Sequence, residues 1–285
     1  MALDMEHLKG WIGRTESRAD LVSATPVQGL SAMLDRDDPE PGAGDPMPPC
    51  WHWLYAFTPI PRQSALGPDG HPNRGGFLPP VPLPRRMWAG SRIEFRSPLR
   101  VGELLQRNST IVDVSGKEGR SGSLVFVRVR HEIGNGSGLS LIEEQDIVYR
   151  DDPKPGEPAP AAKPAPVDCD FRRSIQPDPT LLFRYSALMH NGHRIHYDRP
   201  YAIEVEGYPG LVVHGPLIAT LLLDLLRRNL PHATLERFEF RAVSALFDVA
   251  AFEVCGRREI DGKTVRLWAQ NEEGGLAMDA TAMLA

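Results

Sequence analysis

The stretch from Asn191 to Arg228 reads NGHRIHYDRPYAIEVEGYPGLVVHGPLIATLLLDLLRR, and it determines how the rest of the chain is interpreted. Its last part, Leu217 to Leu226, is apolar except at Thr220 and Asp224. As a helix, this segment would be apolar on nearly every face and would need to be buried along most of its surface. The simplest cover for such a helix is an antiparallel sheet that wraps it.

Working outward, the chain shows a weak internal repeat. Arg237–Arg241 (RFEFR) echoes Arg92–Arg96 (RIEFR). One apolar helix precedes each echo, 27–34 in the first half and 217–228 in the second, and alternating strands follow each. We therefore predict an α+β fold of two halves, each a helix wrapped by an antiparallel sheet. The two sheets could pair edge to edge, which removes exposed strand edges.

Strands are expected where apolar and polar residues alternate or where turn signals bound a short segment. These segments are 92–96, 104–114, 123–133 and 139–149 in the first half, and 237–241, 251–260, 264–270 and 275–284 in the second. Residues 1–34 look helical in pieces. Residues 35–90 show little regular structure, and a loop this long either shapes a site or is a surface insertion.

The domain boundaries follow from a proline-rich segment. Residues 151–168 contain six prolines and form a predicted linker in polyproline II conformation. We expect a degenerate first domain over residues 1–150 and a catalytic domain over 169–285. Nothing in the first half resembles the segment 182–214, so one active site per chain is expected.

Composition excludes several classes. A net charge of −5 argues against a nucleic-acid surface. The three cysteines have wide spacings that fit free thiols in a reducing compartment. The acidic first residues do not resemble a secretory or transit signal, and no apolar segment is long enough to span a membrane. We therefore expect a cytoplasmic protein.

Three histidines, His190, His193 and His196, recur at a spacing of three. On a helix they would spread over about 120°, which is wide for one metal ion. Ser186 lacks the Gly-x-Ser-x-Gly context of a nucleophile. General acid–base chemistry fits better, since an imidazole can exchange a proton with water near neutral pH. The amide of Asn191 could hold that water.

The start of the apolar helix offers a second catalytic element. His214-Gly215-Pro216 lies where unpaired N–H groups and the helix dipole give partial positive charge. A glycine N–H there suits a carbonyl oxygen that gains negative charge. A base beside such a site is typical of an enzyme that moves a proton from the carbon alpha to a carbonyl, or that adds water to the adjacent double bond.

The same residues resemble a known family. Asn191 to His196 resembles the Asp-x-Asn-Pro-Ile-His signature of MaoC-like, (R)-specific enoyl-CoA hydratases, and His-Gly-Pro-Leu at 214–217 resembles their His-Gly-Met-Leu. The segments HRIHYD and EGYPGLVVHGPL are more similar to the branch that contains mesaconyl-C4-CoA hydratase and the type 2 mitochondrial 3-hydroxyacyl-thioester dehydratases. The resemblance implies a double hotdog fold.

The resemblance also implies roles for individual residues. His196 falls on the catalytic histidine, Asn191 on the catalytic aspartate, and Gly215 on the glycine whose N–H binds the thioester oxygen. The departure at Asn191 leaves His196 as the only base of the pair, with Asn191 orienting the water. His193 falls on the signature asparagine, and it either shares the proton transfer or only braces the loop.

Other candidates could contact the substrate. Arg184 could pair with a substrate carboxylate or with the phosphates of CoA. Arg194 could do the same, although an anchoring pair with Asp198 or Glu206 is favoured. Tyr208 and His214 are expected to line the pocket. His190 is expected to be structural or exposed.

The resulting hypothesis is reversible hydration of a 2-enoyl-CoA thioester with a short, branched or dicarboxylic acyl group of the mesaconyl type. A longer 3-hydroxyacyl thioester of fatty acid metabolism is the alternative substrate. No metal or redox cofactor is expected, because CoA is part of the substrate, and the chain could form a homodimer. Two other classes are a hotdog thioesterase, for which Asp224 lies too far along the helix, and a non-catalytic acyl-CoA-binding protein.

Overall fold

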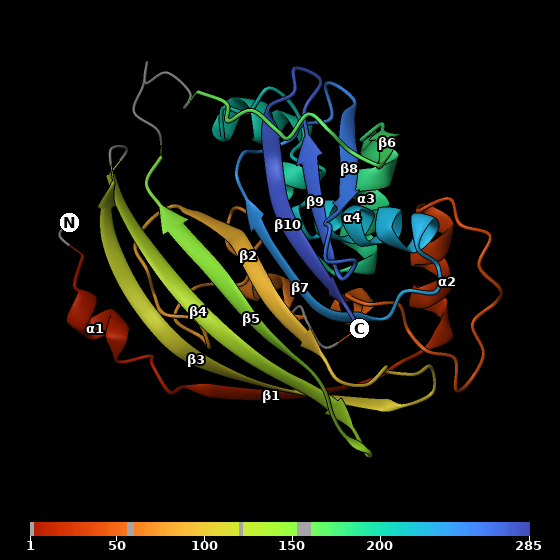
Figure 1. Cartoon of the computed structure of the whole chain (residues 1–285). Coiled ribbons are helices and arrows are strands. Elements are labelled where there is room, and N and C mark those ends of the chain that lie inside the picture. Colours follow the sequence, from red (N-terminus) through yellow and green to blue (C-terminus); the bar gives the residue numbers. More distant parts are fainter. Residues whose placement is uncertain (1–2, 56–59, 120–121, 153–160) are drawn as a thin grey trace.

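The computed structural model describes residues 3–55, 60–119, 122–152 and 161–285 (Figure 1). The described α-helices are α1 (Met5–Lys9), α2 (Ala24–Met33), α3 (Pro179–Leu188) and α4 (Gly215–Asn229). The strands are β1 (Thr15–Leu21), β2 (Arg85–Phe95), β3 (Leu104–Gly119), β4 (Gly122–Asn135), β5 (Gly138–Arg150), β6 (Phe171–Ile175), β7 (Leu235–Ala242), β8 (Phe252–Arg258), β9 (Thr264–Gln270) and β10 (Leu276–Leu284). Helix α4 is the long apolar helix that the sequence predicts.

The strands form one ten-stranded sheet in the order β1-β3-β4-β5-β2-β7-β10-β9-β8-β6. The two halves join at β2 and β7, which pair antiparallel. The join is made by the two echo segments themselves, with Arg92 opposite Glu239 and Glu94 opposite Arg237. Each glutamate therefore lies across from an arginine of the other half. The predicted edge-to-edge pairing of the two sheets is confirmed.

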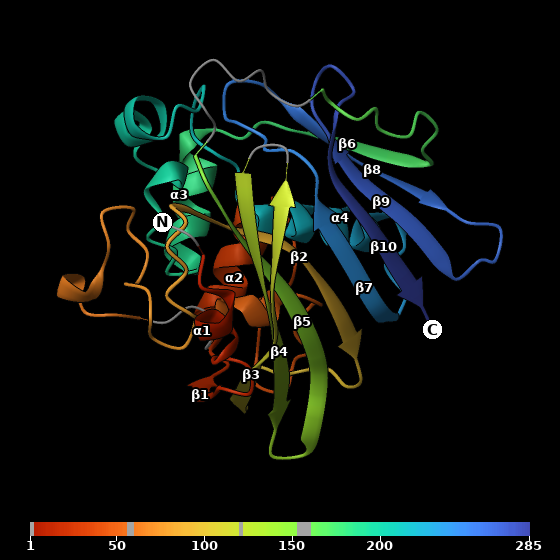
Figure 2. The same ribbon diagram turned by 90° about the vertical axis from the view of Figure 1, so that its left-hand side faces the viewer.

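Helix α4 lies against the strands of the second half, as Figures 1 and 2 show. Ten of its residues, Leu217 to Leu226, are buried without a break. Eight of them, all but Thr220 and Asp224, share one apolar cluster with Phe238 of β7, Val254 of β8 and Leu267 of β9. Burial on all sides explains why the sequence carries no polar face here. The shorter α2 packs beside α3 and belongs to the same cluster.

The sequence analysis was wrong at three elements. Residues 15–21, expected to be helical, form strand β1 on the outer edge of the sheet. This strand alternates exposed and half-buried residues, so its apolar pattern is weak. Strand β6 and helix α3 were not predicted, because β6 carries Arg172 and Arg173 and α3 buries only part of one face. Strand β2 also begins earlier than expected, at Arg85.

The predicted domain boundaries at 150 and 169 stay predictions, since the sheet runs continuously through both halves. Most of the predicted linker, residues 153–160, lies outside the described residues. All three cysteines are free thiols. In the described part of the chain, no helix is long and apolar enough to cross a membrane.

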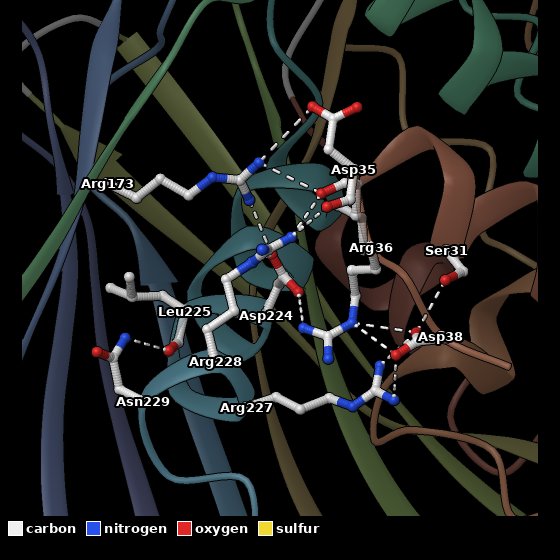
Figure 3. Close-up of polar contacts among 11 residues, drawn as sticks. Ser31, Asp35, Arg36, Asp38, Arg173, Asp224, Leu225, Arg227, Arg228 and Asn229 are labelled. Atoms are coloured by element: carbon white, nitrogen blue, oxygen red, sulfur yellow. Dashed lines mark hydrogen bonds and ion pairs between the residues drawn. The ribbon is translucent and has the colours of Figure 1, made fainter.

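The second half of α4 is tied to the first half of the chain by charge. The carboxylate of Asp224 is buried and contacts Arg36, Arg173 and Arg228, with N–O distances of 2.8, 2.8 and 2.7 Å (Figure 3). These arginines follow α2, lie on β6 and lie on α4, respectively. A buried carboxylate needs such partners to offset its lost hydration. Asp224 therefore has a structural role. This agrees with the expectation that it lies too far along the helix to act as a thioesterase carboxylate.

Candidate active site

The histidine-rich segment leaves α3 through a tight turn. Asp178 caps the start of α3 by accepting a hydrogen bond from the Leu181 N–H, with a distance of 2.8 Å. After α3 ends, the chain reverses at His190, which has φ 48° and is exposed. The N–H of Asn191 then donates to the Ser186 carbonyl at 2.9 Å. This turn directs the residues that follow toward the start of α4.

His196 is buried at the end of a short 3-10 turn, Arg194–His196. Its Nδ1 lies 2.7 Å from the Val212 carbonyl oxygen. A carbonyl can only accept, so Nδ1 carries the proton and Nε2 keeps a free lone pair. Burial lowers the pKa of His196 to about 4, which keeps the ring neutral near pH 7. A neutral imidazole with a fixed tautomer is suited to act as a base.

The buried ring of His214 packs against the ring of His196. The two rings are stacked, with centroids 3.7 Å apart and planes inclined by 19°. His214 is fully buried, and its Nε2 lies 2.8 Å from Ser186 Oγ. Burial, followed by the nearby His196 and His193, lowers its pKa well below the usual value. His214 therefore holds the ring of His196 in place and does not reach the surface itself.

Gly215 begins α4 directly after His214, and Pro216 is the second residue of the helix. Within the described residues, no group accepts a hydrogen bond from the Gly215 N–H. The position is partly accessible, and a Cβ there would have only the Trp88 carbonyl oxygen within 4 Å, at 3.9 Å. An open, unpaired N–H at a helix start can bind a carbonyl oxygen.

A loop from the first half of the chain docks onto this segment. The Arg194 N–H donates to the Asp69 carbonyl at 2.9 Å, and Arg194 Nη1 donates to the Pro68 carbonyl at 3.0 Å. Gly70 has φ +84°, and a Cβ there would lie 1.9 Å from the Gly192 carbonyl oxygen. Only glycine allows this close approach. The segment 66–74 thus shapes the site, which was one of two alternatives that the sequence left open.

This loop brings a carboxylate and an imidazole to the histidine cluster. His71 Nδ1 lies 3.0 Å from an oxygen of Asp69, and the His71 ring lies 4.0 Å from the ring of His193. His193 in turn meets His196 edge-on, with centroids 5.4 Å apart. The described site is therefore a row of four imidazoles, His71, His193, His196 and His214, with one carboxylate at its end.

The electrostatics keep the row neutral. Burial lowers the pKa of His71, although its hydrogen bond to Asp69 opposes this. Burial also lowers the pKa of His193, and the neighbouring His71 and His196 add to the effect. For Asp69, burial raises the pKa, but the hydrogen bonds from the ring and main chain of His71 outweigh it, so the pKa falls. Asp69 is therefore the charged member of the cluster.

The same three groups, Asp69, His71 and His193, place ligand atoms within 4.8 Å of one another. Two imidazoles and a carboxylate form a donor set that zinc accepts. However, His71 Nδ1 is hydrogen-bonded to Asp69, so this nitrogen and the carboxylate already satisfy each other without an ion. The geometry fits a hydrogen-bonded row better than a metal site.

The structure brings His193, His196, His214 and Gly215 together, and Asn191 lies beside His193. Asn191 accepts the His193 N–H through Oδ1 at 3.1 Å, so its side chain shapes the turn. Arg194 pairs with Asp198 at 2.7 Å, which confirms the anchoring role favoured for it. His190 is exposed, as expected.

Two further candidates for substrate binding lie outside the imidazole row. Arg184 is on the exposed side of α3. Tyr208 packs on Phe247, and its hydroxyl accepts a hydrogen bond from Arg85 at 2.9 Å. Their predicted contacts with the substrate stay predictions.

Sequence reasoning missed Asp69 and His71. They lie more than 100 residues before His196, in a segment without hydrophobic periodicity. The sequence signal that could have found them is the Pro-Asp-Gly-His-Pro run at 68–72, where two titratable residues lie in a rigid turn.

Comparison with known proteins places this geometry in context. The family model of hydroxyacyl-thioester dehydratase type 2 matches residues 50–248. Mesaconyl-C(4)-CoA hydratase of Chloroflexus aurantiacus is 48% identical over 277 residues, which cover 96% of each chain. The mitochondrial hydroxyacyl-thioester dehydratase type 2 of Schizosaccharomyces pombe is 28% identical and covers 83% of this chain and 88% of its own.

Solved structures agree on the fold. A MaoC-like dehydratase from Phytophthora capsici has a TM-score of 0.70 and 15% identity, over 99% of both chains. A Mycobacterium tuberculosis protein described as a double hotdog has a TM-score of 0.59 and 14% identity, over 96% of both chains. The predicted double hotdog fold is confirmed.

Proposed function

Because the chain belongs to the hydroxyacyl-thioester dehydratase type 2 family and is a hydro-lyase, we propose that it hydrates a short 2-enoyl-CoA thioester of the mesaconyl-C4-CoA type. The observation that carries the substrate is the 48% identity with the Chloroflexus hydratase along 96% of both chains. The longer 3-hydroxyacyl thioester of fatty acid metabolism stays the second candidate. It is favoured only by the more distant mitochondrial relative.

In the proposed reaction, His196 acts as the base. Its Nε2 lone pair takes one proton from water, and the hydroxide oxygen forms a bond to C3 of the enoyl group. The Nδ1 proton stays on the ring and remains hydrogen-bonded to the Val212 carbonyl oxygen, so the ring does not rotate away during the transfer. The protonated Nε2 then gives its proton to C2, so that H and OH are added across the double bond and His196 becomes neutral again.

Gly215 is proposed to stabilise the charge that develops on the thioester oxygen. Attack at C3 moves electrons onto the carbonyl oxygen and gives an enolate. The unpaired Gly215 N–H at the start of α4 can donate a hydrogen bond to that oxygen, assisted by the helix dipole. The open space beside Gly215 gives the thioester access to this N–H.

Asn191 and His193 complete the proposed site. Asn191 cannot replace the carboxylate of the MaoC-like signature, but its Nδ2 is left to orient the water while Oδ1 holds the turn. Asp69 supplies a carboxylate from the first half of the chain. It is hydrogen-bonded to His71, whose ring lies against His193. An imidazolium that forms in the row during catalysis is stabilised by this charge.

We propose that the reaction needs no metal or redox cofactor, because polarisation and proton transfer are both assigned to protein groups. CoA is then part of the substrate. A cytoplasmic location and a homodimer stay proposals, based on composition and on the sequence features above.

A thioesterase would use the same N–H but would need a carboxylate near the start of α4. Asp224 is fully engaged by three arginines further along the helix, which argues against this role. A non-catalytic acyl-CoA-binding protein would not require the neutral, oriented base that His196 provides.

The proposal is tested with mesaconyl-C4-CoA, crotonyl-CoA and a long-chain 2-enoyl-CoA. Loss of the enoyl-thioester absorbance and release of free thiol are followed in parallel. Hydration predicts rapid loss of absorbance with no thiol, fastest with mesaconyl-C4-CoA. Release of thiol would indicate a thioesterase, and binding without either signal would indicate a binding protein.

A further inference from the structure

Next to the histidine row lies a cavity of about 350 Å³ that no step above uses. Loop residues 67–74 form one wall, and Pro84 and Arg86 at the start of β2 form the other. His71 belongs to this wall, and its ring lies 4.0 Å from the ring of His193, which contacts His196. Two histidines therefore connect the cavity to the proposed base.

The cavity carries a net positive charge. Two guanidinium groups, Arg74 and Arg86, face one carboxylate, Asp69, and His71 is neutral near pH 7. This gives a net charge of +1 for the lining. Asp69 is already satisfied, because both the ring and the main-chain N–H of His71 donate to it at 3.0 Å. Apart from Asp69, no carboxylate lines the described cavity wall, so one of the two guanidinium charges is not balanced there.

The two arginines differ in the partners of their guanidinium groups. Arg74 donates to the main-chain carbonyls of Val81, Leu83 and Pro84, so its guanidinium is committed to holding the loop. Arg86 makes no ion pair with any carboxylate in the described residues. Arg86 lines the same cavity as His71, the first member of the histidine row. Its positive charge contributes to the lowered pKa values of His71 and His193.

A half-buried guanidinium without a counterion is suited to an anionic ligand, and its planar fork matches a carboxylate. Two anions are part of the proposed substrate class: a carboxylate on the acyl group and the phosphates of CoA. In a mesaconyl-type thioester the free carboxylate is attached to C3, the carbon that water attacks. It must lie near His196, whereas the phosphates are many bonds away.

We infer that Arg86 binds the free carboxylate of a dicarboxylic enoyl-CoA in this cavity and thereby selects the substrate. The inference rests on the proposed function. The thioester oxygen is assigned to Gly215 and C3 to His196, and the carboxylate, one bond from C3, points toward Arg86. Arg86 is a specificity residue and takes no part in proton transfer.

The test compares Arg86→Gln with wild type on two thioesters, mesaconyl-C4-CoA and 3-methylcrotonyl-CoA. The second replaces the carboxylate by a methyl group and is otherwise the same at C2 and C3. We expect kcat/KM for mesaconyl-C4-CoA to fall about 10- to 100-fold, as for loss of a charged hydrogen-bonded pair. We expect less than about threefold change with 3-methylcrotonyl-CoA, measured as an inhibition constant if turnover is too slow.

Two further variants complete the experiment. Arg241→Gln removes the same charge from an exposed position on β7 and is expected to leave both substrates unchanged. Arg86→Lys keeps the charge but loses the planar fork, so the preference for mesaconyl-C4-CoA should fall several-fold. If the glutamine variant does not fold, the lysine variant decides.

Equal losses with both thioesters would overturn the inference and would point to a phosphate contact or a structural role. An unchanged preference in either Arg86 variant would overturn it as well. Wild-type enzyme that hydrates neither thioester would instead contradict the proposed function, which separates the two failures.

Discussion

At the scale of single residues, the proposed site is built from neutral imidazoles. Burial is the main cause of the lowered pKa values of His193, His196 and His214. A base must be unprotonated to act, and Val212 decides which nitrogen of His196 is free. The histidine spacing allowed a base to be predicted from sequence. The tautomer could not be predicted, because it depends on a carbonyl 16 residues away.

The lowered pKa gives a first prediction, which has one part for activity and one part for stability. His196 titrates near pH 4 rather than near 6.5, so it stays an active base in mildly acidic solution. We expect kcat/KM to be nearly constant from pH 8 down to pH 5, as measured in initial-rate assays over this range. A loss of half the activity near pH 6.5 would show that His196 is not buried as described.

The same shift affects stability. In the unfolded chain His196 and the buried His131 take up protons near pH 6.5, whereas in the folded protein they do so only near pH 4. The unfolded state thus binds more protons between these values. The free energy of unfolding should therefore fall as pH drops from 6.5 to 4 and be constant above 6.5 with respect to these groups. Urea unfolding at pH 7.5, 6.0 and 5.0 measures this decline.

At the scale of elements, the docked loop 66–74 is the feature that the sequence could suggest but not place. Helix α4 was predictable because every face of it is apolar, and the strands because their alternation matches burial. The loop has no such pattern. Its position depends on contacts between Gly70 and Gly192 and between His71 and His193, which join residues more than 100 positions apart.

A second prediction tests the docking of this loop. In Gly70→Ala the new Cβ would lie 1.9 Å from the Gly192 carbonyl oxygen, so the loop must move and withdraw His71 from His193. We expect kcat/KM to fall at least 10-fold. Gly75→Ala is the matched control, because Gly75 has a similar φ of +87° but its nearest neighbour would be at 3.6 Å.

Both variants carry the same backbone strain, about 1–2 kcal/mol for a non-glycine residue in this conformation. A difference between them in activity therefore reports the close approach to Gly192 alone. Equal activity in the two variants would mean that the loop has no role in the reaction.

At the scale of the whole molecule, two halves share one sheet, and the second half holds the proposed base. The sequence predicted that the two sheets pair edge to edge, and the pairing of β2 with β7 confirms it. The sequence could not reveal that the first half also completes the site through Asp69. Nor could it show that Asp224 connects the halves, because its partners Arg36 and Arg173 are distant in the sequence.

A third prediction concerns this connection. Asp224→Ala removes the common partner of Arg36, Arg173 and Arg228 and leaves three guanidinium groups near a buried, uncompensated position (Figure 3). We expect the free energy of unfolding to fall by about 3 kcal/mol, as for breaking a buried ion pair. Activity per folded molecule should change little. Glu272→Ala, at an exposed residue, is the control for stability.

Denaturant titration with circular dichroism measures both variants. If Asp224→Ala were as stable as Glu272→Ala, the network would not hold the halves together. If it lost activity while fully folded, Asp224 would have a part in the reaction, which would revive the thioesterase.

The most direct measurement of the central claim is the hydration rate of His196→Ala and His196→Gln with mesaconyl-C4-CoA. The glutamine variant keeps a donor for the Val212 carbonyl, so it separates loss of the base from loss of packing. The exposed His190→Ala serves as the control. If His196 is the base, we expect both His196 variants to fold but to lose at least 100-fold in kcat, while His190→Ala stays within twofold of wild type. A folded His196 variant that keeps more than a tenth of the wild-type rate would contradict it.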